Sequence, residues 1–180
     1  ISLVSLGLVL LIVFLFFSVS VYAADIFYRK GLAASRNVET FDRAQDSFAR
    51  AVQLNRFRPD YYLTYSEFLF LRINQELTKS DARPGLIQSW LQSSINTSRQ
   101  AVDLTPNNWT SWERLANLYT SARPLVAGVD QFIIDSLKRA TEKDSKNDVN
   151  RFFVAAYKGA AVIIPSGILW SVMPKAITRS

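Results

Sequence analysis

The 180-residue sequence contains no cysteine and no histidine. The missing cysteines exclude disulfide bonds, thiolate chemistry and cysteine-ligated zinc sites. The missing histidines remove the side chain that most often acts as a general base or a metal ligand. The six glycines are scattered, so the sequence has no glycine-rich phosphate-binding loop. We therefore expect no catalysis by this chain alone, no metal and no cofactor.

Charge is present but is not concentrated in blocks. The chain has 21 Lys and Arg against 15 Asp and Glu, a formal net charge of +6. A nucleic-acid-binding surface usually gathers its basic residues on one face or along one helix, so this spread argues against a nucleic-acid partner. Attraction to an anionic membrane surface is the simpler interpretation.

A long uncharged run opens the sequence. Residues 1–24 contain no charged residue, no proline and a single glycine, Gly7. A helix needs about 20 apolar residues to cross a hydrocarbon core of about 30 Å, so this run predicts a transmembrane helix. A cleaved signal peptide ending near Val21–Ala23 is the alternative. The run is longer than the apolar core of a normal signal peptide, however, and no basic segment precedes it.

The rest of the chain contains segments that resemble one another. Three of them, residues 44–54, 94–104 and 133–144, carry small or apolar residues at positions i, i+4 and i+7, which is typical of one face of an amphipathic helix. When they are aligned on Ala51, Ala101 and Ala140, the spacings are 50 and 39 residues. Such self-similarity is the signature of a helical repeat.

These positions resemble the tetratricopeptide repeat (TPR), a 34-residue helix pair with aromatic, bulky and small residues in fixed order. The first copy is Tyr28, Gly31, Leu32, Ala44, Phe48 and Ala51; the second is Tyr62, Tyr65, Ser66, Leu69, Ser94, Ser98, Ala101 and Pro106; the third is Trp112, Leu115, Ala116, Tyr119, Leu137 and Ala140. The resemblance implies an all-α fold, in which the transmembrane helix leads without a linker into an α-solenoid of about three hairpins over residues 25–147. A plain helical bundle is the alternative.

The second and third units are longer than 34 residues. The extra residues fall within 74–90, around the helix-breaking Arg83–Gly85, and within 122–128. We expect the helices of the second unit to extend on both sides of the break. Insertions in a solenoid map to loops on one edge, so we also expect two tall hairpins to project there.

Residues 148–180 begin like a fourth unit and then depart from the pattern. Asp148–Tyr157 suits a first helix, whereas the segment after Gly159 is apolar and contains Pro165 and Pro174. Three interpretations stay open: a capping element or partial fourth repeat, a segment lying in the membrane interface, or a non-native tail produced by a shifted reading frame.

In tetratricopeptide arrays the first helix of each unit lines a concave, partner-binding groove. Carried over by position, this implies a groove formed by Arg29, Ala33, Arg36, Asp60, Leu63, Glu67, Phe70, Glu113, Asn117 and Thr120. The groove would be basic near the membrane and acidic farther away, which suits an extended peptide of mixed charge. We therefore predict a membrane-anchored module for protein–protein interaction, with a protein or peptide partner.

An apolar span running directly into such repeats also resembles the C-terminal region of bacterial O-antigen ligase or polymerase-like multi-span proteins. The residues that carry this resemblance are 59–63 and 105–108, together with Trp112 and Glu113. The sequence begins with Ile1 rather than Met, so we expect further spans upstream, which would perform any glycan transfer. A structural subunit of an envelope or secretion complex is a third possibility. We predict a bacterial inner-membrane location, and Arg29, Lys30 and Arg36 favour a cytoplasmic body.

Overall fold

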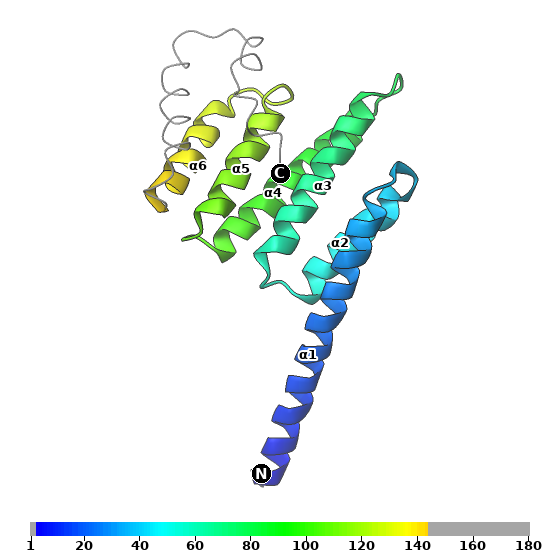
Figure 1. Ribbon diagram of the computed structural model, residues 1–180, viewed down its shortest axis with the longest axis vertical. Coiled ribbons are helices and arrows are strands. Elements are labelled where there is room, and N and C mark those ends of the chain that lie inside the picture. Colours follow the sequence, from blue (N-terminus) through cyan, green and yellow to red (C-terminus); the bar gives the residue numbers. More distant parts are fainter. Residues whose placement is uncertain (1–2, 144–180) are drawn as a thin grey trace. The chain divides into compact units, whose positions relative to one another are not determined.

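The structure is a computed structural model that describes residues 3–143. Over that range the chain forms six α-helices, one 3-10 helix and no strand, which confirms the predicted all-α class (Figure 1). Helices α1–α4 belong to one compact unit, residues 1–106, and α5 and α6 belong to a second, residues 107–180. The predicted cap or partial fourth repeat at 148–180 lies outside the described residues.

Helix α1 (Leu3–Ala34) runs for 32 residues without a break. Its part from Gly7 onward is long and apolar enough to cross a membrane, and its N-terminal half extends beyond the rest of its unit (Figure 1). The hydroxyls of Ser18 and Ser20 donate to the carbonyl oxygens of Phe14 and Phe16, at 2.9 and 3.0 Å. The run predicted as a span therefore continues directly into the first repeat helix, with no linker between them.

The first hairpin joins the C-terminal part of α1 to α2 (Phe41–Leu54) through the 3-10 helix η1 (Val38–Thr40). The Thr40 hydroxyl closes the turn by donating to the carbonyl oxygen of Ala34 at 2.6 Å. Small residues at the helix contact, Ala44 and Ala51, are completely buried, as the repeat pattern predicts. The helices consequently approach closely and enclose the ring of Phe48, which is 1% exposed.

The second hairpin consists of α3 (Pro59–Leu77) and α4 (Pro84–Leu104). Each helix begins with proline, whose fixed φ and missing N–H suit the first helical position. They have 19 and 21 residues against 14 in α2, which confirms the predicted extension on both sides of the break. Where they meet, Ser94 Oγ donates to the Ser66 carbonyl oxygen at 2.8 Å, so the buried Ser94 hydroxyl is satisfied within the core.

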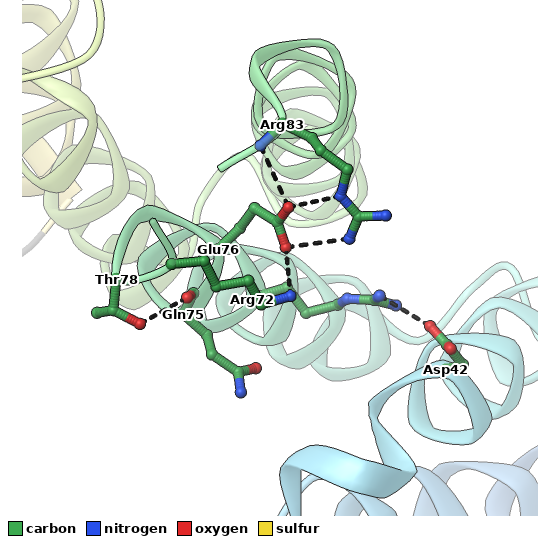
Figure 2. Close-up of polar contacts among 7 residues, drawn as sticks. Asp42, Arg72, Gln75, Glu76, Thr78 and Arg83 are labelled. Atoms are coloured by element: carbon green, nitrogen blue, oxygen red, sulfur yellow. Dashed lines mark hydrogen bonds and ion pairs between the residues drawn. The ribbon is translucent and has the colours of Figure 1, made fainter. Parts of the chain in front are cut away.

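A buried carboxylate stabilises the loop between α3 and α4. Glu76 is 2% exposed and accepts hydrogen bonds from the Nε, Nη2 and backbone N–H of Arg83, at 2.7, 3.2 and 3.2 Å (Figure 2). Lys79 Nζ donates to its second oxygen at 2.7 Å. These hydrogen bonds from Arg83 and Lys79 lower the pKa of Glu76 from 4.5 to about 2. The carboxylate thus ties the end of α3 to the start of α4.

We expect the first unit to lose stability in acid because of Glu76. A carboxylate whose pKa is lowered on folding contributes fully above its ordinary value of 4.5, and this contribution is lost as the pH falls toward about 2. Urea unfolding of the full chain in detergent, repeated across that pH range, measures the loss. Glu76→Gln and Arg83→Gln should both flatten the pH dependence. An unchanged dependence in both variants would contradict this role.

The second unit contains the third hairpin, α5 (Trp109–Ala122) and α6 (Asp130–Lys143). The rings of Tyr119 and Phe132 stack with centroids 5.5 Å apart, and Arg139 lies over the ring of Trp112 at 4.9 Å. Both helices have 14 residues, so the extra length lies in the connecting loop. The prediction of a second tall hairpin is wrong, because the added residues form turns instead of further helical turns.

Candidate peptide-binding surface

Helices α1 and α3, the first helices of two successive repeats, adjoin through aromatic and polar side chains. The rings of Tyr28 and Tyr61 stack with centroids 4.7 Å apart, and the hydroxyls of Tyr28 and Thr64 lie 3.1 Å apart. The Tyr61 hydroxyl donates to Asp25 at 3.5 Å, and Asp25 forms a 2.8 Å ion pair with Arg29. This network fixes the two helices side by side.

Burial is the largest cause that raises the pKa of the Tyr61 phenol. Arg58 opposes the shift, whereas the carboxylate of Asp25 adds to it. Tyr61 consequently stays protonated at neutral pH and serves as a hydrogen-bond donor to Asp25. The cluster is therefore a structural support for the surface beside it.

An exposed stripe runs along α3 next to this cluster. Asp60, Glu67, Leu71 and Asn74 are exposed at spacings of three to seven residues, which places them on one face of the helix. Thr64, whose hydroxyl meets Tyr28 of α1, lies on the same face. Arg29 and Leu32 are exposed on α1 in the turns that hold Asp25 and Tyr28. We call the set Arg29, Leu32, Asp60, Glu67, Leu71 and Asn74 the α1–α3 surface.

Three residues predicted for the groove, Arg29, Asp60 and Glu67, lie on the α1–α3 surface. Leu63 is buried against Tyr62 and Ala101, and Phe70 is also buried. Both side chains therefore belong to the core and are not available to a ligand. Helix α3 packs against both α2 and α4, which leaves it a narrower exposed face than the prediction assumed.

Arg36 and Ala33 were also predicted for this region. Ala33 is exposed on α1, whereas Arg36 is exposed in the turn after α1, which ends at Ala34. The groove was predicted to be basic near the membrane. Its positive charge there is smaller than predicted, because the charge of Arg29 is offset by the carboxylate of Asp25. The stripe on α3 contains two carboxylates and no basic residue, although Arg58 lies 4.0 Å from the carboxylate of Asp60. With Arg29 paired to Asp25, the α1–α3 surface and these two partners carry a small net negative charge.

In the second unit, the predicted groove residues Glu113, Asn117 and Thr120 share one face of α5 through their spacing of four and three residues. Asn117 is exposed, and the other two are half-buried. Thr120 Oγ1 donates to the Ala116 carbonyl oxygen at 2.9 Å. Partial burial raises the pKa of the Glu113 carboxyl, and the neighbouring Arg114 opposes this shift.

Sequence reasoning missed Leu32, Leu71 and Asn74. Leu71 is 45% exposed and follows Glu67 by four residues, so helical spacing from Asp60 and Glu67 alone could have identified it. An exposed leucine between polar neighbours gives a surface the apolar contact that peptide recognition requires. Among residues 3–143, no group of three or more acidic side chains is placed to hold a metal ion.

Comparison with known proteins identifies the fold. The Arabidopsis OM64 TPR domain matches over 78% of this chain and 98% of its own length, with a TM-score of 0.53 and 14% identity. The first TPR domain of Spaghetti (RPAP3), solved with the HSP90 peptide SRMEEVD, matches over 79% and 96%, with a TM-score of 0.56 and 11% identity. No protein-family model and no curated protein sequence matches the chain. The described residues of this protein therefore have the fold of a tetratricopeptide-repeat domain.

Proposed function

We propose that this protein is a membrane-anchored tetratricopeptide module that binds an extended segment of a partner protein and performs no catalysis itself. The observation that carries the proposal is the α1–α3 surface, where the exposed Leu32 of α1 and Leu71 of α3 accompany the carboxylates of Asp60 and Glu67, on two first helices held together by the Tyr28–Tyr61 cluster. A structural neighbour of the same fold was solved with a bound peptide, which supports this mode of binding.

The chemistry of the α1–α3 surface selects the kind of partner. Glu67 and Asp60 favour lysine or arginine, and Leu71 favours an apolar side chain beside them. The peptide SRMEEVD bound by the structural neighbour is acidic, so its charge is opposite to what this surface favours. We therefore propose a partner segment that combines basic and apolar residues.

The test is peptide binding to the full chain in lipid nanodiscs, measured by fluorescence anisotropy. A library of Lys/Leu peptides should contain saturable binders, and matching Glu/Leu peptides should not bind. Glu67→Lys should weaken the best binder by about tenfold or more, the loss typical of a central contact. Glu39→Lys is the matched control, because it makes the same charge change at an exposed residue of η1. Equal losses in both variants, or preference for the acidic peptides, would reject the proposal.

The anchor in this proposal is α1, whose apolar part exposes its leucines, isoleucines and phenylalanines. Such exposure suits lipid as a solvent and would be costly in water. We propose a bacterial inner-membrane location with the repeats on the cytoplasmic side, because Arg29, Lys30 and Arg36 follow the span closely. Protease protection of the repeats in sealed inner-membrane vesicles of known orientation tests the sidedness.

The continuous α1 also suits the second hypothesis, that the chain is the C-terminal region of an O-antigen ligase or polymerase-like protein. In such a protein the repeats would follow the last membrane helix directly, as they follow the apolar part of α1 here. Sequencing the gene upstream of Ile1 separates the two proposals, since only the second requires further hydrophobic spans there.

A further inference from the structure

The turn between α2 and α3, residues 55–58, exposes an aromatic side chain between two arginines. Its Phe57 is 67% exposed, and the flanking Arg56 and Arg58 are exposed as well. The turn is held in place by hydrogen bonds from Tyr62 Oη to the Arg56 carbonyl oxygen at 3.2 Å and from the Phe57 N–H to Asn55 Oδ1 at 3.2 Å. Phe57 is thus presented outward by an ordered turn.

This turn and the apolar part of α1 together line a cavity of about 300 Å³. It is lined by Phe16, Phe17 and Ser20 of α1 and by residues 53–57. At 1.5 Å per residue, Ser20 and Phe16 lie roughly 8 and 14 Å along α1 before Asp25, the first charged residue. The turn therefore lies beside a part of α1 that contains no charged residue.

The charges around the turn are mainly positive. Arg50 lies over the ring of Phe27 at 5.5 Å, and Arg58 lies over the ring of Tyr61 at 5.4 Å. The carboxylate of Asp60 is 4.0 Å from Arg58 and offsets part of this charge. An apolar aromatic side chain with basic neighbours is typical of a segment that lies at a membrane–water interface.

We propose that the α2–α3 turn is a second membrane contact, in which Phe57 enters the boundary between headgroups and acyl chains while Arg56 and Arg58 bind the phosphate groups of anionic phospholipids. The cavity beside Phe16 and Phe17 takes part of an acyl chain. This inference rests on the membrane anchoring proposed above. It places the boundary of the hydrocarbon core near Ser20, so that the residues from Val21 to Ala24 lie within the headgroup region.

The absence of cysteine allows single nitroxide labels to measure depth in the full chain. Labels at Ile12→Cys, Gln53→Cys and Ser80→Cys report on the apolar part of α1, on the cavity and on the α3–α4 loop at the other end of α3. In vesicles of phosphatidylcholine and phosphatidylglycerol in equal parts, labels 12 and 53 should collide with oxygen more than with a nickel chelate. Label 80 should show the reverse.

The three labels separate the two proposals. If label 53 is as accessible to the nickel chelate as label 80 while label 12 is protected, the second contact is rejected and the anchor stands. If label 12 is also accessible to the chelate, the anchoring of α1 itself fails. Phe57→Ser should move label 53 toward the aqueous pattern, and an unchanged collision ratio in that variant would count against insertion of the ring.

The arginines are tested with spin-labelled lipids on the cysteine-free parent. The chain should restrict labelled phosphatidylglycerol in preference to labelled phosphatidylcholine by about threefold or more. Arg56→Gln with Arg58→Gln should bring this ratio close to one. The control is Arg36→Gln with Arg43→Gln, which removes the same charge at the opposite end of the α1–α2 hairpin. This pair should leave the ratio of restricted phosphatidylglycerol to phosphatidylcholine unchanged. Equal loss in both pairs would overturn the proposed phosphate binding.

Discussion

Phe48→Ala should lower the free energy of unfolding by about 3–5 kcal/mol, the range for truncating a buried phenylalanine. Phe48 is 1% exposed and packs against three aromatic rings, with centroids 6.1 Å from Tyr28, 6.1 Å from Tyr65 and 5.2 Å from Phe68. These rings come from α1 and α3, whereas Phe48 lies on α2. Its removal therefore leaves a cavity where all three helices meet.

Urea titration of the full chain in a mild detergent, followed by far-ultraviolet circular dichroism, measures this loss. Phe57→Ala is the matched control, because it removes the same ring from an exposed position and should change stability by less than about 0.5 kcal/mol in detergent. Comparable losses in both variants would show that Phe48 does not hold the first unit together.

Gly31→Leu should destabilise the first unit by about 3 kcal/mol, the upper part of the range for overpacking a closed core. A Cβ added at Gly31 would lie 2.8 Å from two carbon atoms of the Phe48 ring. The ring cannot move away easily, because it is enclosed by Tyr28, Tyr65 and Phe68. Leucine has a better helix propensity than glycine by about 0.8 kcal/mol. The measured loss of stability is therefore the cost of the steric conflict minus this gain.

Gly85→Leu provides the comparison for this glycine. Gly85 lies in the first turn of α4, and nothing is within 4 Å of a Cβ built there. The substitution should be neutral or stabilising by up to about 1 kcal/mol. The two variants share the same chemical change, so an equal loss of stability in both would show that the effect at Gly31 does not come from contact with Phe48.

The helix pairs could be predicted from the sequence because the repeat pattern is local. Aromatic and small residues such as Tyr62 and Ala101 mark where one helix approaches the next, and their spacing follows the helical period. The same pattern located the breaks at Arg83–Gly85 and after Ala122. Trp112 follows the pattern as well, although the structure leaves it half-buried with Arg139 over its ring.

The orientation of the candidate surface could not be read from the sequence in the same way. Leu63 and Phe70 share a helical stripe with Asp60 and Glu67, so a helix considered by itself would expose all four. Packing of α3 against two neighbours buries the apolar pair, and only the three-dimensional arrangement shows this. The ion pair between Glu76 and Arg83 depends on the path of a loop, which residue spacing does not specify.

The unbroken α1 has a mechanical consequence. A helix without proline or an internal turn transmits bending and rotation along its whole length. When a span adjusts to a thinner or thicker bilayer by tilting, the hairpin built on its C-terminal end tilts with it. If α1 spans the membrane as proposed, the orientation of the proposed peptide-binding surface relative to the membrane plane would then follow the thickness of the lipid around Phe14 and Phe16.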